Sequence, residues 1–177
     1  RQRQMCKETV LILGGGSAGY SAAIRARQLG FTVGLIEKEK VGGTCLHTGC
    51  IPTKAYLHAA ELAEEAREAS KVGVNAVLQS IEMGKVRDYK DGIVSGKFKG
   101  LAGLLKMKGV EVIPGEGKLT AQDTITVGGV EYKGKNIILA SGSVSKTFGL
   151  PIEGRVLTST EALELSLIHI SEPTRPY

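Results

Sequence analysis

The chain has 177 residues, of which 42% are hydrophobic, so it is long and apolar enough to bury a core. A net charge of +5 is small for a nucleic-acid-binding protein, and no apolar run approaches the ~20 residues of a membrane-spanning helix. Three cysteines are too few for the disulfide scaffold of a small secreted domain, and no signal peptide is visible. These features predict a globular, cytoplasmic protein.

Both ends of the chain resemble translated sequencing adaptors. Residues 1–6 and 165–177 read like frames of the transposon-end adaptors used in shotgun sequencing, with a natural terminus as the alternative. We therefore leave both stretches out of the fold prediction and expect the chain to be a fragment.

The first elements predict a βαβ unit. Residues 9–13 are a short β-rich run that stops at three glycines, which is typical of a buried parallel strand. Residues 17–29 follow as a helix whose small side chains allow close packing on a sheet, and Gly30 ends it. Residues 31–37 form the second strand, so the crossover is expected to be right-handed.

Two long helices and a small sheet follow this unit. Apolar residues recur at helical spacing over about 51–70 and 81–107, and the lysines of the second helix are assigned to a solvated face. From residue 110 the period changes to two, and Gly128-Gly129 predicts a hairpin turn. The later strands are expected at residues 110–113, 124–127, 130–132 and 136–140. The predicted class is α/β, a Rossmann-like domain with a βαβ unit, long helices and a small antiparallel β-meander.

Gly14-Gly15-Gly16-Ser17-Ala18-Gly19 fits the G-x-G-x-x-G pattern between a strand and a helix. Gly14 permits a tight turn, Gly16 lets the backbone approach a pyrophosphate, and Gly19 lets helix and strand pack closely. Glu37 ends the second strand, 18 residues after Gly19, where its carboxylate can bind an adenosine ribose but would repel a 2′-phosphate. The pattern predicts FAD or NAD rather than NADP, and a glycine-rich structural turn is the alternative.

Cys45 and Cys50 are five positions apart. On a regular helix their Cα atoms would be roughly 8–9 Å apart, whereas a disulfide needs less than about 7 Å. If they bridge, the helix must be distorted between them, and Gly49 and Pro52 favour such a distortion. A helix N-terminus and Lys54, one turn beyond Cys50, would stabilise a thiolate. A cysteine pair beside a dinucleotide indicates electron exchange between a disulfide and a flavin, which favours FAD.

Two other interpretations of the cysteines stay open. One is a zinc site formed by Cys45, His47, Cys50 and His58, although the C-x4-C spacing departs from common zinc motifs and no second cysteine pair exists. The other is a pair of buried, inert thiols. We expect His47 and His58 to be packing or surface residues and expect no metal.

The run from Gly42 to Lys54 resembles the redox motif of the pyridine nucleotide-disulfide oxidoreductases. The resemblance covers about residues 8–165 and is supported by residues 20–25, 54–58 and 156–163. It implies that Cys45 exchanges with the dithiol substrate and that Cys50 faces the flavin. It implies FAD-binding roles for Gly14, Gly16, Ser17, Ala18, Gly19, Glu37, Lys38, Gly43, Thr44, Lys54, Gly117, Ala140, Ser141 and Gly142.

The same resemblance implies how the protein is organised. Residues 7–150 would be the FAD-binding domain, and residues 151–164 would begin the connection to an NAD-binding domain downstream. An interface domain and a catalytic His–Glu pair would also lie downstream, so the fragment alone would be inactive. His47 and residues 144–149 depart from the common family pattern.

Within the family, the chain is most similar to members that oxidise dihydrolipoamide with NAD through FAD and a redox disulfide. Such an enzyme would be a homodimer and would serve the lipoyl-bearing acyltransferase of a 2-oxo acid dehydrogenase complex. The alternatives are a mycothione, glutathione or mercuric reductase, or a non-catalytic flavin-binding module.

Overall fold

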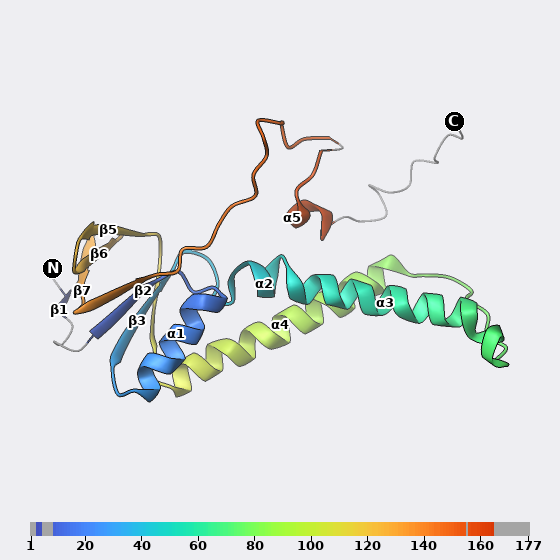
Figure 1. Cartoon of the computed structure of the whole chain (residues 1–177), viewed down its shortest axis with the longest axis horizontal. Coiled ribbons are helices and arrows are strands. Elements are labelled where there is room, and N and C mark those ends of the chain that lie inside the picture. The colour runs from blue at the N-terminus through green and yellow to red at the C-terminus, as the bar shows by residue number, and fades with distance from the viewer. Residues whose placement is uncertain (1–2, 5–8, 155, 165–177) are drawn as a thin grey trace. The chain divides into compact units, whose positions relative to one another are not determined.

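A computed structural model describes residues 3–4, 9–154 and 156–164 of the chain. The chain divides into two compact units (Figure 1). The first contains Arg1–Cys45 and Lys97–Val144, and the second contains Leu46–Gly96 and Ser145–Tyr177.

A parallel sheet forms the centre of the first unit. Its strands are β2 (Thr9–Leu13), β3 (Thr32–Glu37), β4 (Glu111–Pro114) and β8 (Asn136–Leu139), in the order β4-β3-β2-β8. All three neighbouring pairs are parallel, as expected of strands that are joined by crossover connections. Helix α1 (Ser17–Gln28) joins β2 to β3, so the predicted βαβ unit is confirmed.

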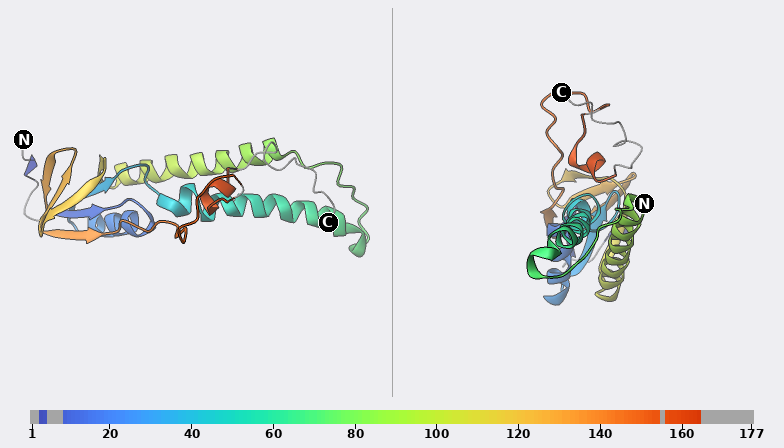
Figure 2. Two further views of the ribbon diagram at one scale, coloured as in Figure 1. Left: turned by 90° about the horizontal axis from the view of Figure 1, so that it is seen from above. Right: turned by 90° about the vertical axis from the view of Figure 1, so that its right-hand side faces the viewer.

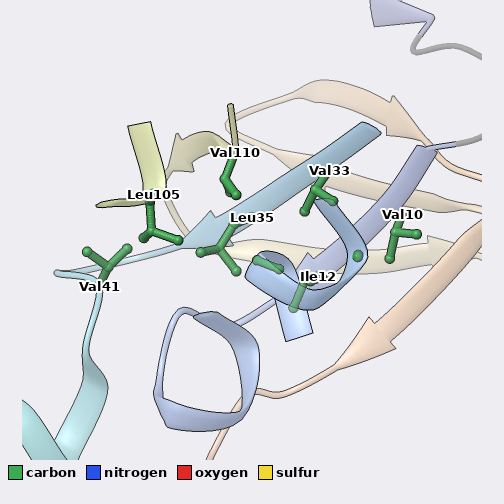
Figure 3. Packing of buried hydrophobic residues seen from close by; sticks show 9 residues of the cluster. Val10, Ile12, Val33, Leu35, Val41, Leu105 and Val110 are labelled. Carbon is green, nitrogen blue, oxygen red and sulfur yellow. The ribbon is translucent and has the colours of Figure 1, made fainter. Parts of the chain in front are cut away.

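One face of this sheet packs against α1 and the end of α4 (Met83–Met107). Successive side chains of a strand point to opposite faces, so alternate residues of β2 and β3 share this core. Figure 3 shows Val10, Ile12, Val33 and Leu35 on this face, with Leu105 beside them. Ala23 and Ala26 are the buried residues that α1 contributes, and their small size lets the helix lie close to the strands. Each fully buried leucine contributes about 1.5–3 kcal/mol.

An antiparallel meander covers the other face of the sheet (Figure 1). It contains β5 (Gly117–Ala121), β6 (Thr124–Val127) and β7 (Val130–Lys133), and β1 (Arg3–Gln4) pairs in parallel with β7. The buried residues between the two layers are Leu11, Ile36, Ile113, Ile125 and Val127.

The predicted hairpin turn joins β6 to β7. Gly128 and Gly129 have φ of 54° and 82°, a conformation that glycine adopts without strain. The opposite residues Val127 and Val130 are paired across the turn, so the turn prediction is confirmed.

Helices make up most of the second unit. They are α3 (Cys50–Glu68), the 3-10 helix η1 (Ala69–Val72), the first part of α4, and the short α5 (Ser159–Ala162). Figure 2 shows α3 and the first part of α4 running in opposite directions. The five-residue helix α2 (Gly43–His47) spans the boundary between the units. No helix among the described residues is long and apolar enough to cross a membrane.

The sequence predicts the long helices and most strands to within a few residues and misses β5, α2 and α5. Four of the five residues of β5 are exposed, so no apolar alternation marks this strand. Helices α2 and α5 have five and four residues, too few for a helical period to show. The assignment of the α4 lysines to a solvated face is wrong for Lys90, which is 1% exposed.

The two-sided core predicts unequal costs for the same substitution. Leu35→Ala removes a side chain that is 0% exposed, and we expect it to lower the free energy of unfolding by about 2–5 kcal/mol. Leu29→Ala, at a side chain that is 59% exposed in the same unit, should change it by less than about 0.5 kcal/mol. Urea unfolding followed by circular dichroism measures both, and equal losses would contradict the described packing.

Candidate functional site

The loop after β2 lies in backbone contact with the segment that follows β8. The Gly14 N–H donates to the Ile36 carbonyl at 2.8 Å, and the Ala140 N–H donates to the Leu13 carbonyl at 2.8 Å. Gly14 has φ of 104°, and a Cβ there would overlap the carbonyl oxygen of Ala140. Glycine is therefore required at Gly14 both for its backbone angle and for this close approach.

Helix α1 begins with its N–H groups open. Gly16 is its N-cap, no side chain caps the first turn, and no acidic residue lies in that turn. Ser17 and Ala18 are exposed at the same end. An uncapped helix N-terminus offers free donors and a partial positive charge to an anion. The residues present thus fit the pyrophosphate of a dinucleotide.

Gly16 also contacts the segment that leads to the cysteines. Gly43 has φ of 58°, and a Cβ added to it would lie 2.7 Å from the Cα of Gly16. The Gly42 N–H donates to the Gly15 carbonyl at 2.8 Å. These contacts bring the start of α2, with Thr44 and Cys45, to the N-terminus of α1.

Gly19 faces back toward the same loop from the first turns of α1. A Cβ on Gly19 would overlap the Gly14 carbonyl, and its next neighbour would be a side-chain atom of Ile12 at 3.5 Å. The third glycine of the motif therefore lets the helix pack directly on the turn, as the sequence pattern predicts.

Glu37 connects two loops through its carboxylate. Its Oε2 accepts a hydrogen bond from the Gly15 N–H at 2.6 Å, and its Oε1 accepts one from the Glu39 N–H at 2.8 Å. Ligands of parallel α/β sheets bind at the carboxyl ends of the strands, where Glu37 lies. A carboxylate has about four acceptor positions, so both oxygens can still accept from ribose hydroxyls. Lys38 is exposed and lies 3.9 Å from a Glu39 carboxylate oxygen, a weak surface pair.

An apolar cavity of about 410 Å³ opens beside Glu37. Phe98 and Ala102 of α4 and Val110 and Val112 near β4 line it, within the first unit. No sequence pattern marks these residues as the lining of a cavity, because their helical and strand spacing is that of ordinary core positions.

The remaining predicted positions of the first unit lie near the same strands. Gly117 begins β5, and a Cβ there would lie 2.7 Å from the Leu13 side chain and 2.8 Å from that of Ile36. This glycine thus lets the meander approach the parallel sheet. Ala140, Ser141 and Gly142 follow β8, and Gly142 has φ of 75°.

The helix is interrupted between the two cysteines, and this is the distortion that a bridge between them would require. Cys45 lies in α2, which ends at His47, and is half-buried. Cys50 is the exposed first residue of α3, whose N-cap is Gly49.

The start of α3 suits a reactive thiol. No acidic residue lies in its first turn, and Pro52 sits where a missing N–H costs nothing. The Thr53 hydroxyl donates to the Gly49 carbonyl at 2.7 Å, which closes the turn, and Lys54 is exposed in the same helix. A thiolate at Cys50 would be stabilised by the helix N-terminus. In the described part of the chain, no three His, Cys, Asp or Glu side chains are grouped as metal ligands.

Comparisons with known proteins found a matching family and similar curated proteins. The model of the family described as pyridine nucleotide-disulphide oxidoreductase matches residues 8–171. The chain is 42% identical over 169 residues to the dihydrolipoyl dehydrogenase of Pseudomonas aeruginosa, covering 90% of this chain and 36% of the relative. It is 42% identical over 171 residues to the enzyme of the same name from Bacillus subtilis, covering 88% and 36%. The chain thus spans about a third of the length of the curated relatives it matches.

A solved structure shows the same fold. The HOCl-induced flavoprotein disulfide reductase RclA from Escherichia coli superposes with a TM-score of 0.69 at 25% identity, over 89% of this chain and 34% of that chain. Its complex with Cu(II) gives a TM-score of 0.72 at 26% identity, over 91% and 35%.

The glycine contacts predict opposite effects for two equal substitutions. In Gly19→Ala the added Cβ overlaps the Gly14 carbonyl, and we expect a loss of about 1–3 kcal/mol of stability. Gly103→Ala, in α4 with open space around its Cβ position, should gain about 0.5–1 kcal/mol. Denaturant unfolding of both variants measures the difference, and the same sign for both would contradict the packing of α1 on its loop.

Proposed function

Because the chain belongs to the pyridine nucleotide-disulphide oxidoreductase family, we propose that it is the FAD-binding part of a dihydrolipoyl dehydrogenase. The observation that carries this proposal is the contact between Gly16 and Gly43. It joins the uncapped N-terminus of α1, which suits a pyrophosphate, to the helix that bears Cys45. The proposed dinucleotide site and the proposed redox cysteine Cys45 would therefore share one loop cluster.

In this proposal the first unit binds FAD through groups of two kinds. The free N–H groups of Gly16, Ser17 and Ala18 would hold the pyrophosphate, and the Glu37 carboxylate would accept hydrogen bonds from the adenosine ribose. Lys38, Gly43, Thr44, Gly117 and the Ala140–Gly142 segment of the same unit are proposed to complete this part of the binding site. Lys54 of α3 is proposed as a further FAD-binding residue from the family resemblance alone. A bound FAD would supply the two-electron chemistry that links a dithiol to NAD.

The cysteines are proposed to take electrons from the substrate by thiol–disulfide exchange. A thiolate of dihydrolipoamide attacks the Sγ of Cys45, the Cys45–Cys50 bond breaks, and Cys50 leaves as a thiolate. The second thiol of the substrate then displaces Cys45. The substrate loses two electrons and becomes the disulfide lipoamide, while the two cysteines gain them. The N-terminus of α3 favours Cys50 as the leaving thiolate.

The rest of the activity belongs to the longer protein. We propose that it binds NAD in a domain beyond this chain, works as a homodimer in the cytoplasm, and serves a lipoyl-bearing acyltransferase. A second candidate is a flavoprotein disulfide reductase that passes electrons to its substrate, and the likeness to RclA at a TM-score of 0.69 favours it.

Serine substitutions test the cysteine chemistry in the full-length protein. Cys45→Ser and Cys50→Ser should each lower dihydrolipoamide-dependent NADH formation by about 10³-fold or more, since either change removes the disulfide. Ser80→Ala, at an exposed hydroxyl outside the site, should leave the rate unchanged. Retention of activity by both serine variants would refute the proposal. Turnover of another disulfide with no dihydrolipoamide oxidation would favour the reductase.

Glu37 offers a test of the cofactor. Denaturation of the full-length protein should release FAD, which chromatography identifies. Glu37→Gln keeps the shape of the side chain but removes its charge, so we expect FAD to bind about tenfold or more weakly. Glu39→Gln, at a side chain that is 78% exposed, should bind FAD normally. Release of another cofactor, or equal affinity of both variants, would contradict the assignment.

A further inference from the structure

Lys90 is the one charged side chain that is buried among the described residues, with 1% of its surface exposed. Its Nζ lies 2.9 Å from Asp91 Oδ1 and 2.9 Å from Glu164 Oε1. Asp91 is its neighbour on α4, but Glu164 lies 74 positions later in the chain. The second contact is therefore a tertiary link within the second unit.

Tyr56 of α3 joins the same cluster. The Lys90 Nζ lies 5.9 Å from the centre of the Tyr56 ring, within the range of a cation–π contact. The Tyr56 hydroxyl donates to the Leu163 carbonyl at 3.0 Å. Helices α3 and α4 and the segment that ends at Glu164 therefore meet at one point.

The ammonium group of Lys90 is held in its charged form. Burial alone would lower the pKa of Lys90, but the hydrogen bonds to Asp91 and Glu164, aided by electrostatic attraction to Tyr56 and Glu164, raise it above the ordinary value of 10.5. A raised lysine pKa means that the contribution to stability is fully present below the ordinary value and is lost only as the pH rises through the folded-state value. The cluster thus stays charged at neutral pH.

The segment that the cluster holds has no buried apolar anchor of its own. None of the described residues from 145 to 164 is buried. Its helix α5 has four residues, and a capping box between Thr158 and Glu161 organises only its own turn. Among the hydrogen bonds described, those of Tyr56 and Lys90 link this segment to α3 and α4.

We propose that Lys90 and Tyr56 form a latch that holds residues 156–164 on α3 and α4. In a protein as long as its relatives, the latch would fix residues 156–164 ahead of the further length, and only in that respect does it rest on the proposed function. Because α3 begins at Cys50, the latch also ties residues 156–164 to the helix that bears a predicted redox cysteine.

Hydrogen exchange on the full-length protein tests the latch. Lys90→Met removes the ammonium but keeps the length of the side chain, and the amides of Ala162, Leu163 and Glu164 should exchange about tenfold or more faster. Lys85→Met is the matched control, because Lys85 makes only a surface pair with Glu82 and its side chain is 76% exposed. It should leave these amides unchanged.

Two milder variants keep the test decisive if Lys90→Met does not fold. Glu164→Gln and Tyr56→Phe each remove one contact and should accelerate exchange at 162–164 less than Lys90→Met does. Lys90→Arg retains the charge and should restore part of the protection. Unchanged exchange in Glu164→Gln and Tyr56→Phe would overturn the latch, as would an equal rise across α3, α4 and the strands. Hydrogen exchange does not depend on catalysis. The outcome of this test is therefore independent of whether the cysteine variants lose activity.

Discussion

Backbone contact between glycines at the carboxyl ends of the parallel strands is the constraint on which the candidate site depends. A Cβ at Gly14, Gly19 or Gly43 would overlap or crowd backbone atoms of Ala140, Gly14 and Gly16. Backbone atoms cannot rotate away as the end of a flexible side chain can, so these positions admit only glycine. The gain is that the N-terminus of α1, the Glu37 carboxylate and the helix with Cys45 are brought into one loop cluster.

Glu37 shows how one side chain can serve both the fold and a ligand. Its two carboxylate oxygens accept the N–H groups of Gly15 and Glu39, at 2.6 and 2.8 Å. These bonds order the loops on both sides of the end of β3 before any ligand arrives. A carboxylate that is already oriented loses little conformational freedom when it binds ribose hydroxyls. The two described hydrogen bonds leave lone pairs on both oxygens that can accept from a ligand.

Sequence patterns predict those elements of this chain that are determined by residues close together in the sequence. The strands at 9–13 and 124–127 are marked by apolar or β-branched runs, and the turn at Gly128-Gly129 by its residue types. The interruption between Cys45 and Cys50 is predicted only on the condition that the two cysteines bridge, because a regular helix would hold their Cα atoms too far apart. Strand β5 could not be predicted, because it is exposed and exists through its pairing with β6. The burial of Lys90 depends on Glu164, 74 positions away, which no local period reveals.

The two units are stabilised by different forces. Large apolar side chains such as Leu11, Leu35 and Ile125 are fully buried in the first unit. In the second unit, the buried apolar residues described are Leu46, Pro52, Ala55 and Ala63, most of them small. Hydrophobic burial scales with area and tolerates small shifts, whereas the Lys90 contacts require specific distances to offset the cost of burying a charge. In the proposed latch, residues 156–164 are therefore positioned by hydrogen-bond geometry rather than by the amount of surface they cover.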